Sequence, residues 1–302
     1  MTDKHRNWTL MEVLRWTAER LKKVTETPRL DTELLLAAVL GIRRIELYMR
    51  HDQPLEKDEL DRFKALIRRR LTGEPVAYLL GRRDFWGRSF LVDARVMVPR
   101  PETELLVEGA LAAAPEDGEV LVLDLCTGSG NVIISILEER PLWRGIGADV
   151  SDDALAVAAS NRDAANLGDR LILAEGDLMA AVERDLRFGV ITANPPYVPN
   201  GDWEGLAPDV KGHEPRGAVT AGTDGLDVIK KLVPAAASAL APGGLLLMEY
   251  DGAAQTEAIT ALAQEAGLVD VEIRKDLAGR DRVLSAKTNQ NRELVDRLQE
   301  TR

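Results

Sequence analysis

One segment of the chain, EVLVLDLCTGSGNVIISILEE, restricts the possible folds more than any other. Its apolar run Val120 to Leu125 is typical of a buried strand, and apolar residues at helical spacing begin at about Asn131. Between them, Gly128 and Gly130 allow a sharp turn and let a ligand approach the main chain. The segment therefore predicts a strand, a ligand-binding turn and a helix, the unit from which α/β sheets are built.

This glycine turn lacks the marks of two common phosphate-binding loops. The dinucleotide fingerprint has a third glycine three residues after the second, and that position is Ile133. The Walker sequence has a lysine after its last glycine, where this chain has Asn131. A phosphate ligand is therefore disfavoured at the turn.

Two further predicted strands end next to acidic residues. One ends at Asp149, where a carboxylate can accept hydrogen bonds from ribose hydroxyls. The alternative for Asp149 is a cap of the following helix, a role that Ser151 or Asp152 can fill instead. The other strand, Leu171 to Ala174, precedes Gly176-Asp177-Leu178, which is expected at the adenine edge. Together these features predict a nucleoside cofactor without phosphates.

The tetrad Asn194-Pro195-Pro196-Tyr197 follows directly after a run of apolar and small residues, 190–193, that predicts another buried strand end. The amide oxygen of Asn194 and the carbonyl of Pro195, held side by side, can accept both protons of a planar –NH₂ group. Pro195 and Pro196 donate no N–H, and Tyr197 is placed to pack on the group that carries the nitrogen. The alternative is a proline-rich turn. Beside a nucleoside site, the tetrad predicts group transfer from S-adenosylmethionine to nitrogen.

These motifs resemble a known family. DLCTGSG, GAD, GD and NPPY, in this order, are similar to the class I S-adenosylmethionine methyltransferases that modify amino or amide nitrogens. GEPVAYLLGRRDFWG, VMVPRPETELLVE, HEP and RKDLAGRDRVLSA resemble the HemK-type release-factor glutamine methyltransferases, from about Pro28 to Ala286. The resemblance implies methylation of N5 of the glutamine in the Gly-Gly-Gln loop of class 1 peptide-chain release factors. S-adenosylhomocysteine would be the second product.

The motifs and the resemblance together give a set of expected site residues. Catalysis is expected from Asn194, Pro195 and Tyr197, and substrate contacts from these three and Pro196. The residues expected to contact the cofactor are Cys126, Thr127, Gly128, Ser129, Gly130, Asp149, Asp177, Leu178 and Asn194. No metal is expected, because one cysteine and three histidines argue against a Cys/His metal site.

Three positions depart from the family pattern. Cys126 stands where the family usually has glycine, a change that bears on the conformation of the turn and on its packing against the cofactor. Leu178 stands where some relatives carry an aromatic residue over the adenine, and Glu249-Tyr250-Asp251 replaces a more usual Glu-x-Gly. None of these changes removes a group that the chemistry requires.

Periodicity gives the domain organisation. Helical spacing predicts helices over Trp8 to about Val24, Leu30 to Leu40, Arg44 to Met49 and Lys57 to Leu71, and a further helix near Glu102. Alternation around Gly87 in RDFWGRSFLVD predicts a hairpin. We expect a helical substrate-recognition domain at 1–80, a β-hairpin linker at 81–98 and a polar tail at 288–302. Residues 99–287 are expected to form a Rossmann-like α/β methyltransferase domain with a mostly parallel seven-stranded sheet.

Charge is unevenly distributed. Residues 1–90 carry 19 Lys and Arg against 14 Asp and Glu, so the chain's total of −11 leaves −16 for the remainder. A catalytic domain this acidic would repel the phosphates of duplex DNA. Arg68-Arg69-Arg70, with Arg62 and Lys64, predicts a basic helical face. That face is either simply solvated or a docking surface for an acidic partner.

The sequence shows no apolar N-terminal signal and no apolar run near the ~20 residues of a membrane span. We expect a cytoplasmic protein that binds neither DNA nor membranes, and we expect it to be a monomer. Two other functions stay open at this point. One is the same chemistry directed at a DNA or RNA adenine or at another protein glutamine, and the other is a fold that binds the cofactor without catalysis.

Overall fold

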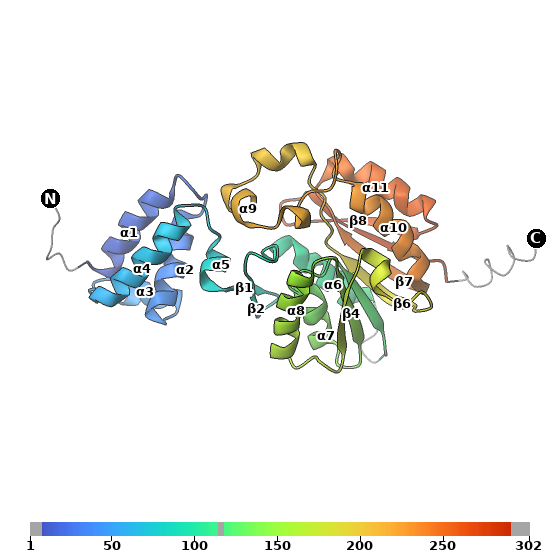
Figure 1. Ribbon diagram of the computed structural model, residues 1–302, viewed down its shortest axis with the longest axis horizontal. Helices are drawn as coiled ribbons and strands as arrows, with labels where there is room; N and C mark the ends of the chain where they lie inside the picture. The colour runs from blue at the N-terminus through green and yellow to red at the C-terminus, as the bar shows by residue number, and fades with distance from the viewer. Residues whose placement is uncertain (1–7, 114–117, 291–302) are drawn as a thin grey trace, which may run out of the picture. The chain divides into compact units, whose positions relative to one another are not determined.

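The computed structural model describes residues 8–113 and 118–290 of the chain. The described residues form two compact units. One contains residues 8–82 and Leu206–His213, and the other contains the remaining described residues, from Arg83 onward. Figure 1 shows the first as a group of helices and the second as a sheet with helices packed on it.

The helical unit confirms the four predicted helices and adds two. Its helices are α1 (Leu10–Leu21), α2 (Pro28–Leu40), α3 (Arg44–Met49), α4 (Lys57–Arg70), α5 (Val76–Leu80) and α9 (Pro208–His213). A capping box starts α1: the Thr9 hydroxyl accepts from the backbone N–H of Glu12, whose carboxylate accepts from the N–H of Thr9. Helix α2 begins at Pro28 and ends at Gly41 in the left-handed conformation.

The basic face expected on α4 is only partly present. Arg70 lies on the same helical stripe as the buried Phe63 and Ile67, so its side chain points into the unit. It is 3% exposed, and its Nε donates to Oδ2 of Asp31 at 2.8 Å. The inclusion of Arg70 in the basic face was therefore wrong, because helical periodicity places it in the core. Arg69 pairs with Glu74 on the surface.

The second unit contains a two-stranded sheet and a seven-stranded sheet. The strands are β1 (Arg82–Phe85), β2 (Arg88–Leu91), β3 (Leu121–Leu125), β4 (Arg144–Asp149), β5 (Leu171–Glu175), β6 (Phe188–Ala193), β7 (Leu240–Glu249), β8 (Val269–Lys275) and β9 (Asp281–Lys287). Strands β1 and β2 form the predicted hairpin, whose two-residue turn, Trp86-Gly87, has positive φ at both positions.

The larger sheet has the strand order β5-β4-β3-β6-β7-β9-β8. Neighbours from β5 to β7 are parallel, and β9 runs antiparallel to both β7 and β8. The prediction of a mostly parallel seven-stranded sheet is confirmed. Its helices are α6 (Glu104–Ala113), α7 (Asn131–Glu139), α8 (Asp152–Ala164), α10 (Asp227–Ala239) and α11 (Ala253–Glu265), with the short 3-10 helices η1 (Pro101–Thr103), η2 (Leu178–Ala181), η3 (Asn200–Gly205) and η4 (Arg216–Ala218).

Both faces of this sheet are buried, as expected for parallel strands with helical crossovers. Leu123 and Leu125 of β3 join a cluster with α10 and α11, whereas the preceding Val122 joins a cluster with α6 and α7. This alternation along one strand assigns the two pairs of helices to opposite faces (Figure 1).

The strand order reverses direction at β3. The chain passes from β3 outward to β4 and β5, and then returns to place β6 on the other side of β3. Ligands bind beyond the carboxyl ends of strands at such a switch point. Cys126, Asp149 and Asn194 stand at or just after the ends of β3, β4 and β6, so three neighbouring strands deliver them to one edge.

Candidate active site

The glycine turn after β3 has a strained backbone. Gly128 and Gly130 have φ of +54° and +77°, and Cys126 has φ of +58°. Such values suit glycine and are unfavourable for other residues. Cys126 thus occupies a conformation that suits glycine better. Glycine is also the residue that the family usually has at this position. Burial raises the pKa of its thiol, so the thiol stays protonated.

The carboxylate of Asp149 is fixed at the end of β4 by backbone donors. Oδ2 accepts from the N–H of Gly128 at 2.9 Å, and Oδ1 accepts from the N–H of Ser151 at 3.0 Å. Ser151 itself caps α8, its hydroxyl accepting from the N–H of Ala154. The helix cap is therefore provided by Ser151. Burial raises the pKa of Asp149, against the effect of these backbone hydrogen bonds. Each oxygen retains acceptor capacity toward the cavity.

One end of the Asn194 amide forms a hydrogen bond, and the other end has no described partner. Nδ2 donates to Oγ1 of Thr103 at 3.2 Å. Oδ1 is buried and has no hydrogen-bond partner among the described residues. A buried carbonyl oxygen without a donor is unfavourable on its own, so it is a natural place for a ligand N–H.

Tyr197, the last residue of the tetrad, turns toward the sheet. Its hydroxyl donates to Oε1 of Glu249 at 3.0 Å, at the end of β7. Glu249 is 1% exposed, and burial raises its pKa to about 7, while hydrogen bonds from Thr103 and Tyr197 and the charge of Arg282 act in the opposite direction. Burial and the neighbouring carboxylate raise the pKa of Tyr197 well above its usual value.

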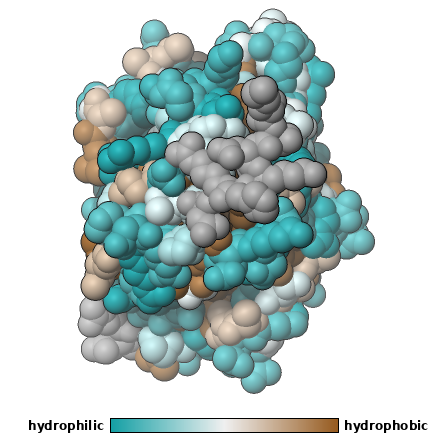
Figure 2. Space-filling view, turned by 90° about the vertical axis from the view of Figure 1, so that its left-hand side faces the viewer, coloured by the Kyte–Doolittle hydropathy of each residue, from teal (hydrophilic) through white to brown (hydrophobic). Residues whose placement is uncertain are grey.

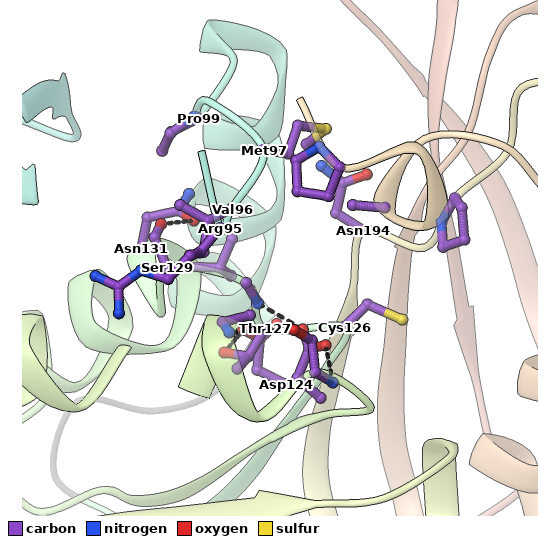
Figure 3. Close-up of a pocket in the computed structure, with 18 of the residues that line it drawn as sticks. Arg95, Val96, Met97, Pro99, Asp124, Cys126, Thr127, Ser129, Asn131 and Asn194 are labelled. Carbon is purple, nitrogen blue, oxygen red and sulfur yellow. Dashed lines mark hydrogen bonds between the residues drawn. The ribbon is translucent and has the colours of Figure 1, made fainter. Parts of the chain in front are cut away.

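A cavity of about 300 Å³ lies at this edge of the sheet (Figure 3). Figure 3 shows Cys126 and Thr127 at the end of β3, Asn131 to one side and Asn194 across from it. The expected residues that line the cavity are Cys126, Thr127, Gly128, Ser129, Asp149, Asn194 and Pro196. The cavity thus joins the glycine turn, the acid of β4 and the tetrad.

Other expected residues lie outside this lining, which does not include Gly130, Asp177, Leu178, Pro195 or Tyr197. Asp177 is largely exposed, with Lys231 at 4.0 Å. Leu178 has φ of +54° and its side chain packs against the sheet core beside α10 and α11. Pro195 is buried.

Several lining residues were not among those predicted. They are Arg95, Val96, Met97, Pro99, Thr103, Asp124, Asn131, Val132, Val150, Ser151, Ala154, Pro215, Gly217 and Ala218. Thr103 belongs to the VMVPRPETELLVE segment, which contributed to the family resemblance but was not assigned to the site. Asn131 was not assigned to the site by any sequence pattern. It is 8% exposed, Oδ1 accepts from the Ser129 hydroxyl at 3.0 Å, and Nδ2 has no described partner.

Beneath the cavity, Asp124 is buried with two hydroxyl donors. Thr127 donates to its Oδ2 at 2.6 Å, and Thr192 of β6 donates to its Oδ1 at 2.7 Å. Burial raises the pKa of Asp124 to about 6. Through Asp124, the pair of hydrogen bonds connects the glycine turn to β6, the strand that Asn194 follows.

Comparison with known proteins gives two family models that match separate parts of the chain. The PrmC N-terminal domain matches residues 12–81, and the methyltransferase small domain matches residues 101–206. A solved structure, the 16S rRNA N2 G1207 methyltransferase (RsmC) of T. thermophilus in complex with AdoMet and guanosine, is 20% identical and covers 69% of this chain and 50% of its own. Its TM-score of 0.51 shows a shared fold.

Relatives at higher identity cover nearly the full length. The release factor glutamine methyltransferase of Geobacter sulfurreducens is 40% identical over 95% of this chain and 99% of its own length. The proteins of the same description from Burkholderia pseudomallei and Chlorobaculum tepidum are 43% and 40% identical, over 88% and 92% of this chain and 94% and 97% of their own. The chain belongs to the release factor glutamine methyltransferase family.

Proposed function

We propose that this enzyme transfers a methyl group from S-adenosylmethionine to N5 of the glutamine in the Gly-Gly-Gln loop of class 1 release factors. The observation that carries the proposal is the Asn194 amide. Its Oδ1 is buried without a described partner, in the same cavity as the glycine turn and Asp149. Methylation of a side-chain amide requires a hydrogen-bond acceptor that holds the target –NH₂ group beside the nucleoside site. The descriptions of the relatives support the same substrate.

The residues around the cavity fit this cofactor. The proposed contacts are Asp149 to the ribose hydroxyls, and the turn Cys126, Thr127, Gly128, Ser129 and Gly130 to the methionine portion. Asn131 Nδ2, a buried donor without a described partner at the start of α7, suits the carboxylate of that portion. Asp177 and Leu178 stay the proposed adenine contacts.

The chemistry places modest demands on the protein. S-adenosylmethionine supplies a methyl group on a sulfonium, already strongly electrophilic, so the proposal needs no metal and gives S-adenosylhomocysteine as product. Asn194 Oδ1 and the Pro195 carbonyl would accept the two amide protons and hold the nitrogen in line with the methyl carbon. As the C–N bond forms, those protons become more acidic, so both acceptors bind the transition state more strongly than the substrate. Pro196 and Tyr197 would shape the substrate side of the tetrad.

We propose that the helical unit recognises the release factor. Between α1 and α4 it has a groove of about 350 Å³ whose apolar lining residues include Trp8, Trp16 and Phe63. The charged residues that line it are Arg20, Lys64 and Arg68, all cationic. On the face that Figure 2 shows, the described residues are mainly hydrophilic. An acidic segment with apolar side chains, presented by the release factor, would match both features.

The proposal also concerns which macromolecules the protein binds and where in the cell it acts. The acidity of residues beyond position 90 disfavours duplex DNA as a substrate. No helix in the described ranges is both long and apolar enough to cross a membrane. We propose a cytoplasmic monomer whose macromolecular partner is the release factor.

A parallel-acceptor assay tests the function. Purified enzyme and S-adenosylmethionine labelled on the methyl group are incubated with a release factor, with the same factor carrying Gln→Ala in its Gly-Gly-Gln loop, and with duplex DNA and adenine-containing RNA. Label should enter only the unmodified release factor. Equal labelling of the Gln→Ala factor, or labelling of nucleic acid alone, contradicts the proposal.

A further inference from the structure

Asn161 is a buried asparagine on α8 whose amide forms hydrogen bonds to main-chain groups outside that helix. Its Oδ1 accepts from the N–H of Leu91 at 2.8 Å, and its Nδ2 donates to the carbonyl of Leu91 at 3.0 Å. The second proton of Nδ2 is directed at the carbonyl of Ser129, at 2.9 Å. Asn161 is 5% exposed and is not among the described residues that line the cavity. One side chain therefore joins the last residue of β2 to the glycine turn.

The bond to Ser129 fixes one peptide group of the glycine turn. The carbonyl of the peptide between Ser129 and Gly130 accepts from Asn161, and its N–H donates to the carbonyl of Thr127 at 2.8 Å. Both polar groups of this peptide are engaged, so its orientation is set. Ser129 lines the cavity, and the turn is the proposed contact for the methionine portion of the cofactor. That portion carries a carboxylate, which a carbonyl oxygen turned toward it would repel.

The bonds to Leu91 hold the segment that follows β2. Leu91 presents both of its main-chain groups to one amide, as it would to a residue of a neighbouring strand. Residues shortly after it line the cavity: Arg95, Val96, Met97 and Pro99. The segment 91–99 therefore supplies one wall of the cavity, and Asn161 connects the start of that segment to the glycine turn.

These bonds require an amide at position 161. Nδ2 gives both of its protons to carbonyl oxygens, and Oδ1 receives a proton. An aspartate has nearly the same shape, but its carboxylate only accepts and would face two carbonyl oxygens. An alanine removes the polar group altogether. The two substitutions therefore distinguish a role of the donors from a role of the shape.

We propose that Asn161 is a positioning residue for cofactor binding, which holds the Ser129 carbonyl toward α8 and attaches the segment 91–99 to the glycine turn. The proposal rests on the proposed function, because it assigns this turn to S-adenosylmethionine. Asn161 acts only through Ser129 and Leu91, and it contacts neither the methyl group nor the target nitrogen. Its loss should therefore weaken cofactor binding without slowing transfer from the bound cofactor.

The test combines calorimetric affinity for S-adenosylmethionine with single-turnover methylation of release factor. Asn161→Asp should raise the Kd by about tenfold or more, because two buried carbonyls lose their donor. Asn161→Ala should raise the Kd no more than Asn161→Asp does, although it changes the shape much more. The methylation rate, at cofactor concentrations that saturate each variant, should stay within about threefold of wild type.

Two controls separate this effect from added charge and from lost stability. Asn166→Asp makes the same chemical change at an exposed position just after α8, and its Kd should stay near the wild-type value. Ile259→Val shortens a fully buried side chain on α11, so it should lower the thermal midpoint and leave the Kd unchanged.

Hydrogen exchange in the wild-type protein tests the same link without any substitution. Leu91 is not among the described residues that line the cavity, but Asn161 joins its amide to the turn. Saturating S-adenosylmethionine should therefore slow exchange of the Leu91 amide by at least about threefold. The Trp86 amide, in the turn of the same hairpin, donates to Oε1 of Glu104 at 2.8 Å and should exchange at an unchanged rate.

Some results would overturn the proposal. These are a Kd of Asn161→Asp within twofold of wild type, a methylation rate at saturating cofactor that falls as much as the affinity does, or an equal effect of the cofactor on the Leu91 and Trp86 amides. Failure of the wild-type enzyme to bind S-adenosylmethionine or to methylate release factor would instead contradict the proposed function, and the two failures are therefore distinguishable.

Discussion

Asp149 Oδ2 accepts a hydrogen bond from the backbone N–H of Gly128 at 2.9 Å, so the acid of one strand is locked to the glycine turn of its neighbour. In the proposed site this carboxylate also binds the ribose hydroxyls. Asp149→Ala should therefore weaken S-adenosylmethionine binding by about 1.5–3 kcal/mol, typical of hydrogen bonds to a charged group. Calorimetry on the folded variant measures this.

Asp152→Ala serves as the control, because Asp152 lies in the first turn of α8 and is exposed. It should bind the cofactor nearly as the wild type does. Unchanged affinity in Asp149→Ala would remove Asp149 from the cofactor site.

Cys126 provides a test of backbone strain. Because its φ is +58°, Cys126→Gly should be more stable than Cys126→Ala by about 1 kcal/mol. For a chain of this size that is about 2–4 °C in the thermal midpoint. Glycine should have the opposite effect in a regular helix, so Ala110→Gly, in α6, should lower the thermal midpoint. An alanine variant that is as stable as the glycine variant would show that the turn adapts without strain.

Glu249 should make stability depend on pH. Its pKa is about 7 in the folded protein against an ordinary value of 4.5, chiefly because of burial. The protonated form therefore favours folding, and this contribution is fully present below the unfolded pKa and is lost as pH rises through about 7. Glu249→Gln cannot ionise, so its stability relative to wild type should increase by up to about 3 kcal/mol between pH 5 and pH 8.

Denaturant unfolding at several pH values measures this difference. Asp124, whose pKa is raised to about 6, adds its own pH dependence to both proteins and cancels in the comparison. Glu257→Gln, at an exposed position on α11, is the control. A difference between Glu249→Gln and wild type that is constant over this pH range would contradict the raised pKa.

The cationic groove of the helical unit can be tested by charge reversal. Arg68→Glu should raise the KM for intact release factor by about fivefold to tenfold, which corresponds to about 1 kcal/mol for a charge pair at a partly exposed surface. It should leave cofactor affinity unchanged. Methylation of a short peptide that contains the Gly-Gly-Gln sequence should also be unchanged, because the groove and the cavity share no lining residue in the described ranges.

Arg62→Glu is the matched control on the same helix. Arg62 does not line the groove and lies near Asp58, at 3.8 Å. An equal rise in KM for both variants would mean that the general charge of the unit, and not the groove, attracts the partner.

The sequence predicted the fold largely because its apolar periodicity and glycine turn are strong local signals. Helices α1 to α4, strands β3 to β6 and the hairpin all follow from spacing or turn chemistry. Helix α5 was missed because five residues are too few for a periodic pattern. The assignment of Leu206–His213 to the helical unit was missed as well, since it depends on contacts with residues far away in sequence.

For the site, the residue types at the strand ends predicted much of the cavity lining. The partners and directions of the hydrogen bonds could not be predicted from the sequence. Nothing in the sequence indicates that the Tyr197 hydroxyl turns to Glu249, or that Asn194 Nδ2 bonds to Thr103, 91 positions away. Such contacts depend on how β6, β7 and η1 pack. The role of each residue in the tetrad stays a prediction.

The most direct test of the account is the methylation rate of Asn194→Ala. The variant removes the proposed acceptor, while most of the proposed cofactor contacts, at the glycine turn and Asp149, stay in place. Single-turnover methylation of release factor at saturating cofactor should fall by at least about 10²-fold, or about 2.7 kcal/mol of transition-state stabilisation, with cofactor affinity much less affected. Asn194→Asp keeps an acceptor of similar size and should retain partial activity. A rate for Asn194→Ala within threefold of wild type would contradict the account, because the tetrad would then be only a turn.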